Sequence, residues 1–192
     1  MEIIKKDTQA DLKNFVNIRQ FTLAPGVKEN GPEIAAIRKY VKNKNYSEIE
    51  EYIISGKIIE MSEKHNIIVN SGLEEYAKSN SGERATAPAI TYGILCVSPS
   101  PTPVPASVIS DITEGFRKLA SSRSHDGNIS YIDFFFAAAD CNGTYPRFAN
   151  VIDGSSTPNS GILHSYVDNI PVWTKTTAQS LFVSCEYHYN NV

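Results

Sequence analysis

The chain of 192 residues contains little cysteine, and its three thiols are far apart in the sequence. Cys96, Cys141 and Cys185 are odd in number, which argues against a disulfide framework. They also lack the closely spaced ligand pairs that are typical of zinc sites. We therefore expect reduced, buried thiols that pack in the core, and no metal.

Long apolar runs and a strong excess of one charge are also missing. No run approaches the roughly 20 apolar residues that a membrane-spanning helix needs. Residues 1–15 carry three lysines but lack the apolar stretch of a secretory signal. The net charge of −3 gives no basic footprint, and the basic group Arg117, Lys118 and Arg123 has no interleaved aromatic residues. The sequence therefore predicts neither nucleic-acid binding nor membrane insertion.

No pattern of catalytic residues stands out. Cys185 and His188 are three apart on a predicted strand, so alternation places them on opposite faces and they cannot act as nucleophile and base. Asp111 and Glu114 are more simply acids at a helix start than paired catalytic carboxylates. The glycines do not form a phosphate-binding loop. We predict no catalytic residue and no cofactor, with a small hydrolase as the least favoured alternative.

The first 65 residues are charged and have a mainly helical pattern. Residues 1–31 are weakly periodic, with a short helix possible over 11–19 and turn dipeptides after it, and we expect an extended arm. Pro32 suits the first position of a helix in which Ile34, Ile37 and Val41 share one face. A second helix is expected from Ser47 to Gly56, with Ser47 and Glu50 as a capping box. Residues 32–65 would then form a helical docking module, in which 57–61 are either a strand or an extension of the second helix.

Residues 66–192 are expected to form a β-rich assembly domain. A helix is predicted over residues 71–81, with Ser71 and Glu74 as a capping box. Strands are expected near 90–97, 116–122, 129–138, 145–152, 162–167 and 181–189, and prolines at every second position predict an extended loop over 98–107. The last strand should alternate, with Cys185 and Tyr187 on one face. The fold class is therefore α+β: N-terminal short helices and an extended arm, followed by a mainly antiparallel β-sandwich-like domain.

Several aromatic and proline residues are candidates for contacts between copies of the chain or with a partner. The aromatic residues are most simply core, or core plus a subunit interface, while the proline-rich segment is a stiff connector or a docking arm. A sugar-binding module would use exposed tyrosines and the single tryptophan. The candidate interface residues are Phe15, Phe21, Pro101, Pro103, Trp173, Tyr187 and Tyr189.

The order of signals from residue 66 to residue 190 resembles a group of bacteriophage tail-associated virion proteins. The signals are the helix start at 70–73 (NSGL), the apolar strand at 90–97, the loop at 98–107, the segment TEGFR at 113–117, and KTTAQSL at 175–181 before an alternating terminal strand. The chain departs from the group in having Ser-Pro-Ser-Pro at 98–101, where relatives often have Gly-x-Gly.

The resemblance implies a structural component of a tailed phage virion, of the tail fibre adaptor, baseplate or collar type. It would be made in the host cytoplasm and then assembled into the virion. Its partners would be other copies of itself and neighbouring tail proteins. The alternative is a receptor- or carbohydrate-binding β-sandwich module that contacts a host surface glycan.

Overall fold

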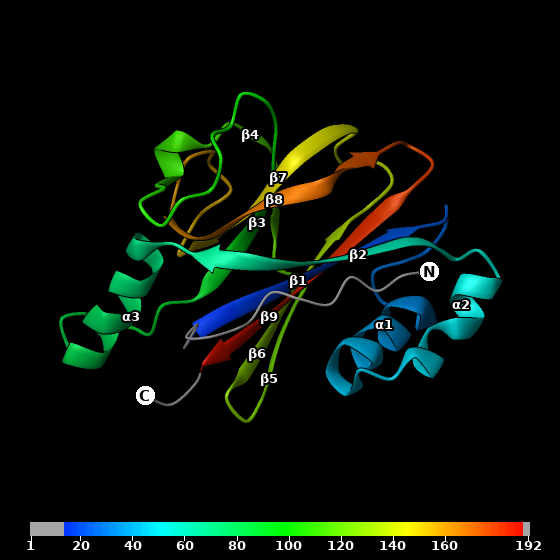
Figure 1. Ribbon diagram of the computed structural model, residues 1–192, viewed down its shortest axis with the longest axis horizontal. Helices are drawn as coiled ribbons and strands as arrows, with labels where there is room; N and C mark the ends of the chain where they lie inside the picture. The colour runs from blue at the N-terminus through cyan, green and yellow to red at the C-terminus, as the bar shows by residue number, and fades with distance from the viewer. Residues whose placement is uncertain (1–13, 190–192) are drawn as a thin grey trace.

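The computed structural model describes residues 14–189, with the side chains of residues 14, 66, 67 and 170 excepted. The helical elements are α1 (Pro32–Asn43), η1 (Tyr46–Glu48), α2 (Glu50–Ile54), α3 (Asn70–Ser81) and η2 (Ile109–Asp111). The strands are β1 (Asn14–Leu23), β2 (Ile58–Ile68), β3 (Ile90–Cys96), β4 (Glu114–Leu119), β5 (Ser122–Asp126), β6 (Ile129–Phe136), β7 (Gly143–Ile152), β8 (Ile162–Lys175) and β9 (Ser180–Tyr189). Figure 1 shows α1 and α2 at one end of the molecule and α3 at the other.

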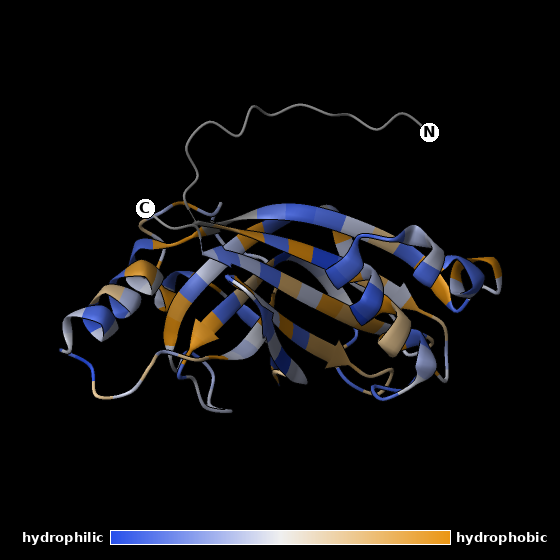
Figure 2. Cartoon of the chain, turned by 90° about the horizontal axis from the view of Figure 1, so that it is seen from below, coloured by the Kyte–Doolittle hydropathy of each residue, from blue (hydrophilic) through white to orange (hydrophobic). Residues whose placement is uncertain are grey.

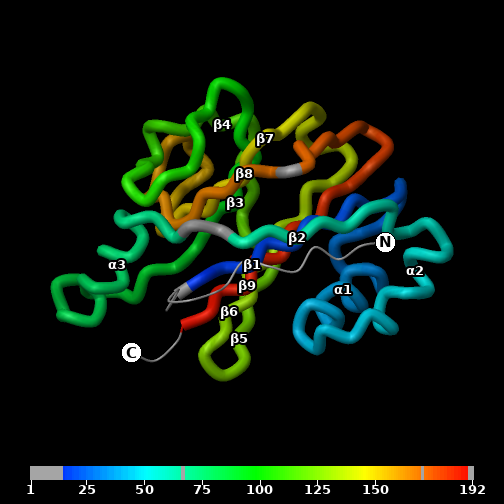
Figure 3. Tube along the Cα trace, viewed as in Figure 1, coloured from blue at the N-terminus to red at the C-terminus, as the bar shows by residue number. Residues whose placement is uncertain are grey.

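The nine strands within residues 14–189 form two antiparallel layers that share β2. The hydrogen-bonded order is β4-β3-β7-β8-β2-β1-β9-β6-β5. Most of β2 pairs with β1, and only its last two residues pair with β8. The second crossing lies in the short link between β4 and β5. There Ala120 donates a hydrogen bond to Thr91 in β3, and the next residue, Ser121, donates one to Asp133 in β6. The chain therefore crosses between the layers at both edges, and its path can be followed in Figure 3.

The main core lies between the two layers. Ile18, Phe134 and Val183 point inward from one layer and meet Leu95 and Phe148 from the other. Gly93 makes this approach possible, because a Cβ there would lie 2.8 Å from the Phe134 ring. Figure 2 shows hydrophobic and hydrophilic residues alternating along the strands, as burial of one strand face requires.

A second core lies on the outer face of the β1–β9–β6 layer, beneath α1. Ile34, Ile37 and Val41 are buried there against Phe21 and Phe182. The predicted apolar face of this helix is therefore confirmed. Among residues 14–189 no helix is long and apolar enough to cross a membrane.

The coarse fold class is confirmed, but the N-terminal segment differs from the expectation. The prediction of a helix over residues 11–19 is wrong for residues 14–19. These residues belong to the strand β1, which pairs with β2 on one side and with β9 on the other. Residues 14–23 are thus part of the sandwich and not an arm. Residues 1–13 of the expected arm lie outside the described residues.

Further expectations about helix starts and strand bounds are also corrected. Ser71 does not cap α3, because its hydroxyl donates to the Leu163 carbonyl, and α3 begins at Asn70. Asn45, not Ser47, provides a side-chain cap for the turn before α2. Residues 122–126 form β5, although only residue 122 fell within an expected strand, and the strand expected at 162–167 continues to Lys175.

The alternation predicted for the last strand is confirmed. Cys185 and Tyr187 lie in the core between the layers, while Phe182 packs on the outer face. His188 lies half-buried, and its Nε2 is 2.7 Å from Glu186.

Candidate functional site

A cleft of about 540 Å³ lies at the α3 end of the sandwich. α3 contributes Leu73, Tyr76 and Asn80 to its wall. The strands and the segment before β3 contribute the remaining lining residues: Ile68, Pro88, Ser130, His164 and Tyr189. Its lining combines apolar surface with hydroxyl, amide and imidazole groups, which is the composition typical of small-molecule sites.

His164 is placed in this cleft by a β-bulge in β8. In the pairing of β7 with β8, Asn150 lies opposite Ser165 and the next residue, Val151, lies opposite Leu163. His164 is therefore the extra residue, and a bulge of this kind redirects a side chain out of regular alternation. The imidazole lies between the rings of Tyr76 and Tyr187, with centroid distances of 5.4 Å and 5.1 Å.

The His164 ring is buried yet has no hydrogen-bond partner among the described residues. Its exposed fraction is 1%, and neither Nδ1 nor Nε2 has a partner there. Burial lowers the pKa of His164 to about 3, so the imidazole is neutral at physiological pH. Buried polar atoms are nearly always hydrogen-bonded in native proteins, so two unpaired nitrogens in one ring call for an explanation.

Gly72 fixes the position of α3 above this histidine. A Cβ on Gly72 would lie 2.5 Å from His164 Nδ1 and 2.8 Å from His164 Cα. The main chain of α3 therefore rests directly on the bulge. Because two of the nearest atoms are backbone atoms of β8, only glycine permits this approach.

Two tyrosines stand at the edge of the cleft. The hydroxyls of Tyr76 and Tyr189 are 3.3 Å apart, and both side chains are half-buried. Burial raises the pKa of both phenols above its ordinary value, so both are neutral hydroxyls at physiological pH. Beneath them, Tyr187 is fully buried and its hydroxyl accepts a hydrogen bond from Asn150 at 2.8 Å.

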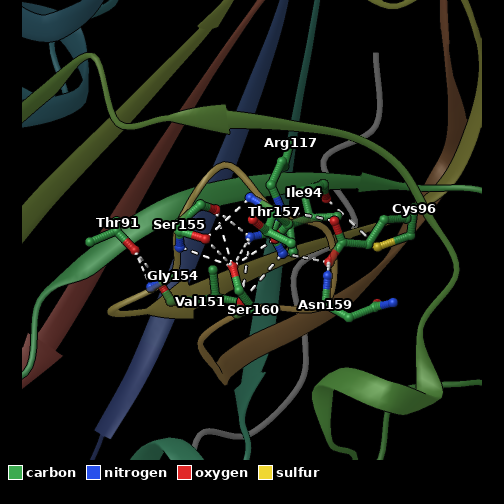
Figure 4. Close-up of polar contacts among 11 residues, drawn as sticks. Thr91, Ile94, Cys96, Arg117, Val151, Gly154, Ser155, Thr157, Asn159 and Ser160 are labelled. Carbon is green, nitrogen blue, oxygen red and sulfur yellow. Dashed lines mark hydrogen bonds and ion pairs between the residues drawn. The ribbon is translucent and has the colours of Figure 1, made fainter.

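A second polar cluster holds the loop between β7 and β8. Figure 4 shows Arg117 pointing at this loop. Its guanidinium binds Glu114 through two hydrogen bonds of 2.8 Å and 2.5 Å, and donates to the hydroxyl of Ser160 at 2.8 Å and the carbonyl of Ser155 at 2.6 Å. Glu114 in turn accepts from the backbone of Asn159 at 2.8 Å. The pair therefore positions residues 155–160 and contains no arrangement of nucleophile and base.

A third cluster of charges lies on the outer face of β1 and β9. Glu186 is 1% exposed and pairs with both Arg19 and Lys44. Burial raises the pKa of Glu186, but the two cations more than offset this and hold it below its ordinary value. Every charge in this cluster has a partner of opposite sign, which is the pattern of a structural network.

Three of the seven candidate interface residues are buried inside the chain. Phe21 and Tyr187 are 0% exposed and Trp173 is 3% exposed, so these three cannot supply a contact surface in this fold. Trp173 packs on Phe148 in the core, and therefore cannot be a platform for a sugar. The expected surface role of these residues was wrong because their strands are covered on both faces.

The other four candidate interface residues lie at or near the surface. Pro101 is exposed, and Phe15, Pro103 and Tyr189 are half-buried. Phe15 stacks on His188 with ring centroids 4.2 Å apart. Of the seven candidates, only Tyr189 lines the cleft. An interface role for these four stays a prediction.

The sequence analysis did not single out His164. Regular alternation along 162–167 would have placed it on the same face as Tyr166, whose packing is on the outer side of β7. No signal in the sequence marks the bulge. No protein-family model matches the chain, and no curated protein and no solved structure is significantly similar to it.

Proposed function

We propose that this chain is a structural subunit of the tail region of a bacteriophage particle, which associates with copies of itself and links neighbouring virion proteins. The proposal rests on the order of sequence signals between residues 66 and 190. The residues of those signals also make tertiary contacts within the sandwich.

The first signal, NSGL, contains Gly72, which lets α3 rest on the backbone of β8. Another signal, TEGFR, contains the Glu114–Arg117 pair that fixes the loop between β7 and β8. A chain that keeps these residues in this order therefore keeps the contacts between its elements, which is why such an order is informative about the fold.

The last signal, KTTAQSL, begins with Lys175. This side chain is 1% exposed, and its ammonium donates to the Ala138 carbonyl at 3.1 Å. Burial lowers the pKa of Lys175. A buried ammonium is costly without hydrogen bonds, so the lysine here ties the β8–β9 turn to the segment after β6.

The surface contains aliphatic side chains suited to contacts between subunits. Ile54 at the end of α2 is 79% exposed, and Ile59 in the adjoining strand β2 is 53% exposed. Burying one such side chain contributes about 1.5–3 kcal/mol to association. The corner formed by α2 and the start of β2 is therefore the surface we assign to contacts between copies.

The proposal is tested by cross-linking mass spectrometry of purified particles whose genome encodes this chain. We expect the chain to be recovered at a fixed ratio to known tail proteins, with cross-links from lysines near α2, such as Lys57, to a neighbour. Absence of the chain from washed particles that contain complete tails would contradict the proposal.

Self-association is tested by light scattering of the purified chain with Ile54→Glu. A buried carboxylate opposes association, so we expect the wild type to form oligomers and the variant to be monomeric. Leu119→Glu is the matched control, because Leu119 is 54% exposed but lies on β4, at one end of the strand order. A wild-type chain that stays monomeric, alone and with particle extracts, would contradict this part of the proposal.

A further inference from the structure

We propose that the cleft beneath α3 is a binding site for a neutral saccharide, with His164 as the hydrogen-bonding group at its floor. The cleft was not part of the sequence-based expectation, which placed a sugar platform at exposed tyrosines and Trp173. The site depends on the local geometry of α3, β8 and β9, and would exist whether or not the chain belongs to a virion.

The size of the cleft fits a small ring-shaped ligand. Its volume of about 540 Å³ lies within the range of roughly 300–1,000 Å³ found for small-molecule sites. Ile68, Leu73 and Pro88 give it apolar surface, against which the carbon-bound face of a sugar ring can pack.

The electrostatics of the cleft favour a neutral ligand. Among its described lining residues none is an aspartate, glutamate, lysine or arginine. A phosphate or carboxylate would therefore lose its hydration without gaining a cation, and an ammonium would find no carboxylate. The lining hydroxyls of Tyr76, Tyr189 and Ser130 instead offer both donors and acceptors.

The two unpaired nitrogens of His164 indicate that the floor of the cleft receives a hydrogen-bonding ligand. A neutral imidazole has one N–H donor and one nitrogen acceptor. A sugar hydroxyl has the matching pair of functions, since it donates through its hydrogen and accepts through its lone pairs. Nδ1 lies against the main chain of α3 at Gly72, so the ligand hydroxyl would pair with Nε2, one of the two ring nitrogens that the described residues leave without a partner.

The aromatic edge of the cleft supports the same ligand class. Tyr76 and Tyr189 each present an apolar ring and a polar hydroxyl, and their ring centroids are 5.8 Å apart. Side chains of this kind pack on apolar surface while they hydrogen-bond at the rim. A ligand with an apolar face and equatorial hydroxyls uses both properties.

The test is an NMR titration of the full chain labelled with ¹⁵N in its histidine rings. The probes are neutral methyl glycosides of glucose, galactose, mannose and N-acetylglucosamine, with N-acetylneuraminic acid and glucosamine as charged comparisons. We expect at least one neutral glycoside to shift the His164 ring nitrogens in a saturable way. The proposal is overturned if no neutral glycoside does so, or if only the charged sugars bind.

Variants separate binding at this cleft from binding elsewhere. His164→Phe, followed through amide signals of α3, should raise the Kd about tenfold, the equivalent of about 1.4 kcal/mol. If His164→Phe does not fold, Tyr189→Phe is the test variant instead. We expect its Kd for the glycoside to be about threefold higher than that of the wild type, because a rim hydroxyl is lost. Tyr46→Phe is the matched control, because Tyr46 is 49% exposed beside α2 and should leave the Kd unchanged. Equal affinities for wild type, His164→Phe and Tyr189→Phe would overturn the proposal.

Discussion

Replacement of Gly72 by alanine tests the contact that places α3 on the sandwich. The new Cβ would lie 2.5 Å from His164 Nδ1, 2.8 Å from His164 Cα and 2.9 Å from the His164 carbonyl oxygen. A rotation of the imidazole can relieve only the first of these contacts. The other two involve the backbone of β8, so α3 itself has to move away from the strand.

Two opposing effects set the size of the change. Alanine is a better helix former than glycine by about 1 kcal/mol, which favours the variant. Overpacking against a rigid neighbour costs about 1–3 kcal/mol, and a backbone neighbour places the cost at the upper end. We therefore expect Gly72→Ala to lower the free energy of unfolding by about 1–2 kcal/mol in spite of its higher helix propensity.

Urea unfolding followed by circular dichroism measures this difference. Ala77→Gly calibrates helix propensity in the same helix, because Ala77 is exposed, and it should cost about 1 kcal/mol. A Gly72→Ala variant that is as stable as the wild type, or more stable, would show that α3 does not rest on β8 and would refute the reasoning about the site.

Three further predictions concern the ionisable groups. Because burial lowers the pKa of His164 to about 3, the unfolded chain gains a proton below pH 6.5 that the folded chain does not. The free energy of unfolding should therefore decrease as the pH falls from 6.5 to 3, by up to about 1.4 kcal/mol per pH unit. His164→Phe should remove this contribution to the pH dependence measured in urea melts. Arg117→Ala leaves Glu114 buried without its partner, so we expect a loss of about 3 kcal/mol and faster amide exchange over 155–160, whereas unchanged exchange would contradict the positioning role. Arg19→Gln should raise the pKa of Glu186 and cost about 2–3 kcal/mol at pH 7, a deficit that narrows below pH 4.5 as the carboxylate is protonated; an equal deficit at pH 3 would refute this assignment.

The elements best predicted from the sequence are those whose apolar pattern is regular and whose ends carry turn residues. The face of α1 formed by Ile34, Ile37 and Val41 is buried as expected. The terminal strand alternates as expected because each of its faces packs against a separate core. In both cases neighbouring apolar side chains form one face of the element, and a nearby apolar surface packs against that face.

β1 was missed because its sequence also fits a helix. Phe15, Val16 and Arg19 are spaced as on one helical face, yet β1 is a strand with a neighbour on each side. Both partners are distant in the sequence, and pairing of this kind overrides local propensity. The charge of Arg19 is tolerated in the sheet only because Glu186 and Glu63 lie beside it.

The sequence by itself determined a mainly antiparallel β protein with an amphipathic helix α1 and an alternating last strand, since these depend on the order of neighbouring residues. Only the tertiary structure decided that Trp173 is buried, that Arg117 holds a distant loop, and that His164 faces a cleft. The physical reason is that a bulge and the pairing of remote strands set which way a side chain points, and neither leaves a periodic mark in the chain.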